Sequence, residues 1–230
     1  MISILKTLET ANAPSLAGGF GCLLGVWGER SPMTPLLCTF LLAADTTAAN
    51  RWEEVARTRD GIRVRARIDK ARGQGETLAQ GLIKAPLEKV WAVLADVARY
   101  QEFMPYMSES RLVRSTAAHV WQYCRTKTPV VSSRDYTLKF TMTRGREGAP
   151  SFIRFEQDNA AGPRAKAGVV RVEVVEGSWE LTSVDNGRAT QAIYRLRTNP
   201  GGSVPLWLAH LGNTRAIPDI VRAVRRRARK

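Results

Sequence analysis

Alternation of apolar and polar residues dominates the chain from Trp52 onward. Between 62 and 69 apolar residues alternate with charged ones, which predicts a strand, and the turn signal Gly73-Gln74-Gly75 precedes a returning strand over 76–83. A short helix is predicted over 51–59. Further strands, separated by turn signals, are predicted over 109–115, 119–127, 135–143, 151–157, 169–175, 178–184 and 190–198. The pattern therefore predicts an antiparallel meander with one apolar face.

Helical periodicity appears in two further places. After Pro86 an apolar stripe at helical spacing predicts a helix, and a second short helix follows over 97–103. From Ser203 to the end the spacing is again helical, with Pro218 as a kink or a restart. The order is a β-hairpin, two short helices, a long antiparallel run and one long C-terminal helix. This is an α+β fold, in which a curved antiparallel sheet wrapped around the C-terminal helix leaves an internal apolar cavity.

Several short motifs occur in an order that resembles a START domain, the StAR-related lipid-transfer module. They include Met104-Pro105-Tyr106, Glu109-Ser110-Arg111, Pro129 to Tyr136 and Gly168-Val169-Val170-Arg171. The resemblance covers about Trp52 to Arg229. It implies the helix-grip fold of the Bet v 1-like superfamily and the binding, often with transfer, of a lipid or other apolar molecule. Sterol-binding animal members carry an acidic residue and an arginine inside the cavity. Trp121 and Phe140 stand near those positions here, which disfavours a cholesterol-like ligand.

Strand parity predicts which side chains face the cavity, because alternate residues of a strand share a face. With the apolar parity of 135–143 directed inward, Arg134 lies at the same parity near one end, and Arg134 and Arg171 are the candidates to meet a phosphate, carboxylate or hydroxyl group. The predicted lipid-binding residues are Trp121, Tyr123, Arg134, Tyr136, Leu138, Phe140, Met142, Arg171, Trp179, Leu208, Leu211 and Ile217. Two plainer interpretations stay open. The apolar positions are ordinary core, and Arg134-Asp135 is a local charge pair at a strand end.

The formal net charge of +14 favours anionic partners without choosing among them. Basic residues on one side of the C-terminal helix, namely Arg222, Arg225, Arg226 and Arg229, are candidates for docking to an anionic membrane surface, since basic amphipathic helices suit bilayers. A solvated helix face is the plainer interpretation. Nucleic acid is not expected, because no nucleic-acid-binding module is recognisable.

The sequence contains no familiar catalytic motif. His119 and His210 are the only histidines, and there is no nucleophile elbow, P-loop or dinucleotide fingerprint. The three cysteines have no metal-ligand spacing, so neither a metal nor another cofactor is expected. A monomeric carrier without enzyme activity is predicted. The alternatives are an aromatase/cyclase of the polyketide type, with Arg134, Tyr123 and Tyr136 moving protons, and a helix-grip domain that docks to another protein.

The first fifty residues differ from the rest, so the chain divides into a leader, 1–50, and a folded domain, 51–230. The apolar run 35–44 has the length of a signal-peptide core, and small residues follow it. It is too short to cross a bilayer. A signal peptide around 33–49 predicts export to the periplasm or outside the cell. The alternative is a disordered leader on a cytoplasmic protein.

Overall fold

The computed structural model describes residues 51–69, 74–128, 131–146, 148–199 and 206–230, and at 68, 69, 128, 131 and 206–214 it describes the backbone alone. The predicted leader, 1–50, lies outside the described residues. In chain order the elements are β1 (Glu53–Arg57), β2 (Arg63–Asp69), β3 (Gln74–Ile83), α1 (Leu87–Ala95), the 3-10 helix η2 (Val97–Glu102), β4 (Met107–Ser115), β5 (His119–Thr128), β6 (Val131–Thr143), β7 (Ser151–Gln157), the 3-10 helix η3 (Asn159–Ala161), β8 (Val170–Arg171), β9 (Val174–Val184), β10 (Ala189–Asn199) and α2 (Leu206–Ala228).

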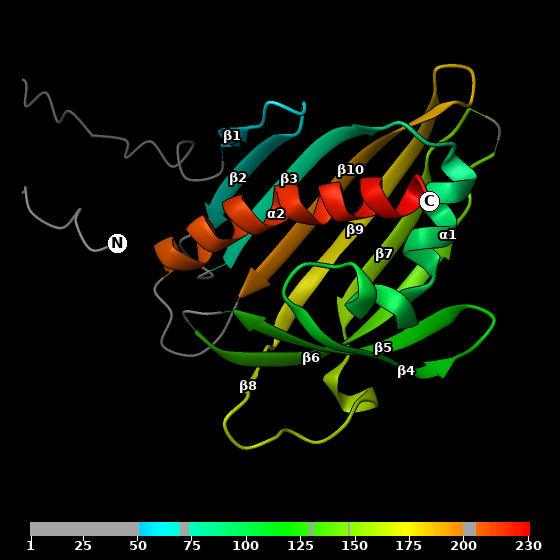
Figure 1. Ribbon diagram of the computed structural model, residues 1–230. Helices are drawn as coiled ribbons and strands as arrows, with labels where there is room; N and C mark the ends of the chain where they lie inside the picture. The colour runs from blue at the N-terminus through cyan, green and yellow to red at the C-terminus, as the bar shows by residue number, and fades with distance from the viewer. Residues whose placement is uncertain (1–50, 70–73, 129–130, 147, 200–205) are drawn as a thin grey trace, which may run out of the picture. The chain divides into compact units, whose positions relative to one another are not determined.

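The described strands form one ten-stranded sheet in the order β1-β2-β3-β10-β9-β7-β6-β5-β4, with the short β8 paired to β6. Neighbours along that order are antiparallel, whereas β8 runs parallel to β6. The N-terminal hairpin joins the last strand, because β3 pairs with β10. The predicted α+β architecture, a curved antiparallel sheet with a long C-terminal helix, is confirmed (Figure 1).

Two element predictions were wrong. The helix predicted over 51–59 is the edge strand β1, which pairs with β2 across a register shift between Glu54 and Ala56. The pairing energy of the sheet overrides the weak helical propensity of this short segment. The strands predicted over 169–175 and 178–184 are instead the two-residue β8 and one long strand, β9, that runs through Gly177.

Helix α1 has the predicted apolar stripe, and a side-chain hydrogen bond joins it to η2. Val90 and Leu94 of α1 are completely buried, as expected for one apolar face. η2 follows directly, and its Tyr100 hydroxyl donates a hydrogen bond of 2.5 Å to the Leu94 carbonyl. This bond fixes the Tyr100 ring, which matters because that ring forms part of the cavity wall described below.

Helix α2 lies across one face of the sheet, over β2, β3 and β10, with α1 near its C-terminal end (Figure 1). Its side chains Ile217, Val221 and Val224 are buried in the same core as residues of β2, β3 and α1. Pro218 lies inside the helix and does not restart it. The sheet face under α2 is therefore the inner face, and the opposite face is the outer one.

Candidate functional site

A cavity of about 270 Å³ lies between the inner face of the sheet and α2. Its walls come from η2 and the loop after it, from inward positions of β5, β6, β7, β9 and β10, and from Ala216 and Ile220 of α2. Burial increases along the strands: Arg134 and Thr126 are half-buried, whereas Leu138 and Gln122 are buried. The cavity therefore has a closed apolar end and a mouth near Arg134.

Tyr106 marks the mouth. It is 43% exposed, it lines the cavity, and its backbone adopts φ 64°, in the left-handed region that few non-glycine residues occupy. Its carbonyl oxygen accepts a hydrogen bond of 2.9 Å from the Lys127 backbone N–H. The loop after η2 is thereby tied to β5, and the ring stands at the rim.

Five of the predicted residues line the cavity, and four of them come from β6. Arg134, Tyr136, Leu138 and Phe140 alternate along β6 and face inward, as the parity argument predicts, and Trp179 reaches the same space from β9. Their common parity follows from the pairing of β6 with β5 and β7, which fixes one face of all three strands toward the core.

The inward orientation predicted for Trp121 and Tyr123 is wrong. In the register of β5 and β6, Gln122 is opposite Leu138, so Gln122 shares the inner face and the neighbouring aromatic residues point outward. Trp121 donates from Nε1 to Asp158 at 2.8 Å, and the Arg114 guanidinium lies 3.8 Å from its ring centre. Both aromatic residues are nevertheless buried, on the outer face of the sheet.

Arg171, predicted to meet the polar group of a ligand, does not line the cavity either. Its Nε and Nη2 atoms donate to the two carboxylate oxygens of Asp135 at 2.7 and 3.2 Å, and Nη2 also donates to the Pro163 carbonyl at 3.1 Å. Asp135 is fully buried and accepts a third hydrogen bond from the Tyr123 hydroxyl at 2.9 Å. The partner of Asp135 is therefore Arg171, and the local pairing with Arg134 considered above does not form.

Of the remaining predicted residues, Met142 and Ile217 lie close to the cavity without lining it. Met142 is partly buried against the core, and Ile217 of α2 is buried in it. The neighbours Ala216 and Ile220 face the cavity instead. Leu208 and Leu211 belong to α2, but their side chains lie outside the described part of the structure.

The sequence analysis missed several cavity residues, notably Gln122, Cys124 and Thr126 of β5, Tyr100 of η2 and Tyr194 of β10. The Gln122 amide nitrogen donates to the Val97 carbonyl at 2.6 Å and to Ser110 Oγ at 2.8 Å, while its oxygen is buried without a hydrogen-bond partner. The alternation of Ala192, Tyr194 and Leu196 in β10 was a usable signal for Tyr194. The sequence of β5 gave no such signal for its cavity residues, because the inward face of that strand is less apolar than its outward face.

The polar groups of the cavity suit hydrogen bonding better than proton transfer. Burial raises the pKa of the Tyr136 and Tyr194 hydroxyls and of the Cys124 thiol, so all three are neutral near pH 7. Burial also lowers the pKa of Arg134, but a guanidinium stays charged at neutral pH. One of its Nη atoms donates to the Ser132 carbonyl at 2.7 Å, which holds the side chain at the mouth.

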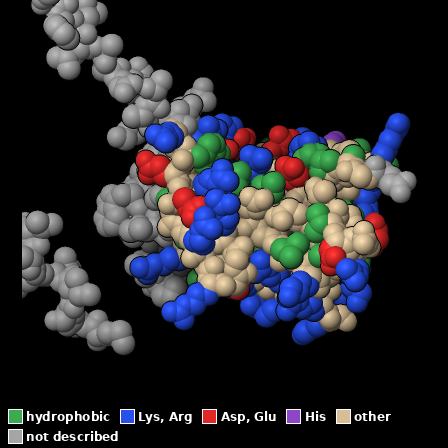
Figure 2. All heavy atoms as spheres, turned by 90° about the horizontal axis from the view of Figure 1, so that it is seen from above, with side chains coloured by type: hydrophobic (Ala, Val, Ile, Leu, Met, Phe, Trp, Pro, Cys, Tyr) green, Lys and Arg blue, Asp and Glu red, His purple; other side chains and the backbone are tan. Residues whose placement is uncertain are grey.

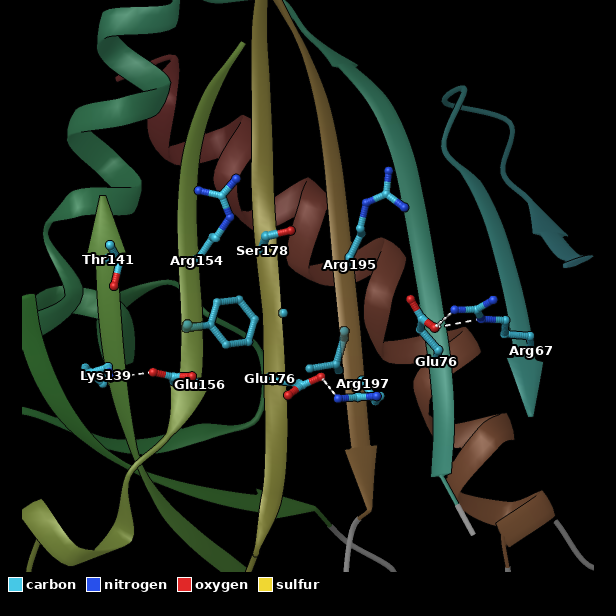
Figure 3. A pocket seen from close by; sticks show the side chains of 13 residues that line it. Arg67, Glu76, Lys139, Thr141, Arg154, Glu156, Glu176, Ser178, Arg195 and Arg197 are labelled. Carbon is cyan, nitrogen blue, oxygen red and sulfur yellow. Dashed lines mark hydrogen bonds and ion pairs between the residues drawn. The ribbon is translucent and has the colours of Figure 1, made fainter. Parts of the chain in front are cut away.

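A second hollow, of about 520 Å³, lies on the outer face of the sheet, with α2 behind the strands (Figure 3). Charged side chains line it and pair across strands, as in Arg67 with Glu76 and Lys139 with Glu156. Cross-strand ion pairs of this kind stabilise a solvated sheet face. Phe155 and Leu196 are the apolar side chains among its lining residues, whereas the inner cavity is lined mainly by apolar and aromatic ones, so the inner cavity is the candidate site.

The four C-terminal arginines predicted to dock to a membrane do not form one exposed face. Arg222 donates to both carboxylate oxygens of Asp60 at 2.9 and 3.0 Å, and Arg225 is only 8% exposed and donates to the same residue. Arg226 and Arg229 are exposed and border a hollow of about 510 Å³ with Lys84. In Figure 2, Lys and Arg side chains are spread over the visible face among fewer acidic ones.

Among the described residues no cluster of three or more His, Cys, Asp and Glu side chains could hold a metal ion. The helices in the described ranges include none that is long and apolar enough to span a bilayer.

A predominantly antiparallel, ten-stranded sheet that grips a C-terminal helix over an apolar cavity defines a START-like helix-grip domain. Residues 83–225 match the family model "Polyketide cyclase / dehydrase and lipid transport", and the chain belongs to that family.

Two solved structures and one relative in sequence are similar to this chain. The chain is 26% identical to the solved StAR-related lipid transfer protein (fragment 25–204) from Xanthomonas axonopodis, over 78% of this chain and 99% of that one, with a TM-score of 0.69. It is 27% identical to the uncharacterized protein PA1579 of Pseudomonas aeruginosa over 77% of this chain and 87% of that protein. The Zhui aromatase/cyclase from Streptomyces sp. R1128 shares the fold, at 15% identity over 68% of this chain and 94% of that one, with a TM-score of 0.55.

Proposed function

We propose that this protein binds an amphipathic, mainly apolar small molecule of the lipid class in the inner cavity and carries it between membranes without changing it chemically. The observation that carries this proposal is the gradient within the cavity, from a closed apolar end to a mouth that presents Arg134. Removing apolar ligand surface from water supplies roughly 25 cal/mol per Å². The cation at the mouth orients the polar end of the ligand.

Helix α2 is the element that closes the cavity. Ala216 and Ile220 form part of its wall, whereas Arg222 and Arg225, farther along the helix, are tied to Asp60 in the turn before β2. The ligand enters when the first half of α2 moves away from the sheet. The family to which the chain belongs and the lipid transfer protein from Xanthomonas axonopodis support this function.

The direct test is native mass spectrometry of the protein purified from its own host, combined with lipid transfer between donor and acceptor vesicles. We expect a bound amphiphile and protein-dependent transfer. Ala216→Trp, which fills the cavity from α2, should abolish both. Ala92→Trp is the matched control, because Ala92 is an exposed position on α1. An empty cavity together with no transfer by the unsubstituted protein would refute the proposal.

An aromatase/cyclase activity is the second candidate, and the likeness to the Streptomyces enzyme favours it. Arg134 and Tyr136 do lie in the cavity, but Tyr123, the third residue considered for proton transfer, is on the outer face. A buried tyrosine with a raised pKa is also a weak acid near neutral pH. Conversion of an aromatic polyketide by the purified protein, lost in Arg134→Ala, would establish this activity in place of simple carriage.

We further propose that the protein is exported, acts as a monomer and meets anionic membranes rather than nucleic acid. The apolar run 35–44 followed by small residues supports export, and the formal charge of +14 supports an anionic partner. A membrane is favoured over nucleic acid because the sequence has no recognisable nucleic-acid-binding module. N-terminal sequencing of the cellular protein tests the first point, and sedimentation of the purified protein tests the second. For the third, Arg226→Gln with Arg229→Gln should weaken binding to vesicles that contain anionic lipid, while Arg154→Gln on the outer face should not.

A further inference from the structure

The closed part of the cavity is walled by a continuous arc of aromatic rings. Tyr100 contacts Phe140 edge to face at 6.4 Å between ring centres, and Phe140 contacts Phe155 at 5.8 Å. Phe155 then stacks on Tyr194 at 6.1 Å, and Tyr194 contacts Trp179 at 4.6 Å. All five rings line the cavity. Four of them come from β6, β7, β9 and β10, which are neighbours in the sheet (Figure 1). The arc of rings therefore crosses these four strands.

Gly177 makes the arc continuous. It lies on β9 between Phe155 of β7 and Leu196 of β10, where a side chain would separate Phe155 from Tyr194. A Cβ atom at position 177 would lie 2.7 Å from the Phe155 ring and 2.1 Å from the Arg195 carbonyl oxygen. Because glycine has no side chain, the Phe155 ring leans across β9 and meets the Tyr194 ring at 27° between their planes.

A wall of this kind discriminates between ligands of equal size. Flat aromatic molecules gain offset-stacked and edge-to-face contacts that a saturated chain cannot make, and each such contact adds roughly threefold to tenfold in affinity beyond area burial. A flexible chain also loses more conformational freedom when it is confined. The shape of the cavity wall therefore favours a rigid, flat ligand.

Size and polarity narrow the ligand class further. At about 270 Å³ the cavity lies at the small end of the range usual for ligand pockets, roughly 300–1,000 Å³, so it suits a compact ligand such as a two-ring system. The hydroxyls of Tyr136 and Tyr194 make no hydrogen bond to any other described residue, and both residues line the cavity. The Arg134 guanidinium at the mouth is placed to meet an acidic group.

We propose that the ligand is a flat aromatic or conjugated amphiphile, about the width of two fused rings, with a carboxylate or similar acidic group at its outer end. A saturated acyl chain is the alternative ligand class. This inference rests on the proposed ligand-binding function and specifies which apolar molecules the cavity prefers.

The test compares 2-naphthoic acid with undecanoic acid, which contain the same numbers of carbon and oxygen atoms, by isothermal titration calorimetry. The unsubstituted protein should bind 2-naphthoic acid at least threefold more tightly. Phe155→Leu and Tyr194→Leu should each reduce that preference by threefold or more, whereas Tyr194→Phe, which keeps the ring, should retain it. Phe152→Leu is the matched control, because Phe152 precedes Ile153 on β7 and faces outward.

Each outcome has a defined meaning. A ratio of the two dissociation constants cancels any general loss of stability, since both acids meet the same folded protein. Equal or tighter binding of undecanoic acid, or a preference that survives both leucine substitutions, overturns the inference while leaving ligand binding intact. Failure of both acids to bind, together with an empty cavity and no lipid transfer, overturns the proposed function itself.

Discussion

Replacing Asp135 by asparagine should destabilise the protein strongly, although the two side chains have the same shape. The Asp135 side chain is 1% exposed and that of Arg171 is 17% exposed, so the ion pair is removed from water. In Asp135→Asn the Arg171 guanidinium stays in the same place without a counter-charge. Breaking a buried pair in this way costs about 3–5 kcal/mol. We expect a loss near the lower end, because Arg171 keeps its bond to the Pro163 carbonyl.

A double-mutant cycle measured by urea denaturation isolates this pair. Arg171→Gln alone should also destabilise, since it leaves the carboxylate of Asp135 buried with only the Tyr123 hydroxyl as donor. The double variant carries two neutral amides that can bond to each other, so its cost should fall short of the sum of the single costs by about 2 kcal/mol or more. Arg154→Gln, an exposed change on the outer face, should cost less than about 1 kcal/mol.

Two results would contradict this reasoning. If Asp135→Asn lowers the unfolding free energy by less than about 1 kcal/mol, the Arg171 guanidinium is not held away from water, although its low exposure implies that it is. If the two single costs add up in the double variant, the two side chains do not interact energetically, despite their separation of 2.7 Å.

Three further predictions concern the ion pair between α2 and Asp60, the arginine at the cavity mouth and the movement of α2 that admits the ligand. The side-chain hydrogen bond from Arg222 holds the pKa of Asp60 well below its ordinary value, so ionised Asp60 stabilises the folded protein fully above about pH 4 and less as the pH falls further. Asp60→Asn should remove this acid-dependent part of the unfolding free energy. An unchanged dependence of the unfolding free energy on pH in Asp60→Asn would contradict this prediction. Arg134→Gln should weaken binding of an acidic probe about tenfold but barely affect a neutral probe of the same shape, as measured by calorimetry with Arg111→Gln as control. Pro218→Ala restores a backbone donor inside α2 and should slow ligand exchange between vesicles in stopped-flow transfer, whereas an unchanged rate would show that the helix does not bend there.

The sequence predicted those parts of the fold in which the apolar period is strong. In β6 apolar and aromatic residues alternate with polar ones, and the parity of this alternation correctly placed Arg134, Tyr136, Leu138 and Phe140 in the cavity wall. The α1 stripe was equally reliable, because Val90 and Leu94 are buried as its period requires. In α1 one face meets the core and the other is more exposed, so pattern and burial agree. In β6 the outward Asp135 and Thr137 are buried as well, but they are polar, so the apolar parity still marks the inner face.

The orientation of β5 could not be predicted in this way, because both of its faces are buried. The segment 158–172 covers the outer side, where Asp158 accepts from Trp121 and Arg171 reaches Asp135 beside Tyr123. The outward residues are consequently more apolar than the inward Gln122, and parity chosen by hydrophobicity selects the wrong face. The position of Arg171 was mispredicted for the same reason, because nothing in the local sequence pattern shows that the segment 158–172 folds back over the outer face of the sheet.

The absence of a side chain at Gly177 has a consequence for engineering. Because Gly177 has no side chain and its backbone lies close to the Arg195 carbonyl, the Phe155 side chain fills the inner cavity at this point of β9. Smaller or larger side chains at that single position should therefore resize the compartment stepwise while the strand geometry stays fixed. A designer who wants this scaffold to accept bulkier guests would begin there.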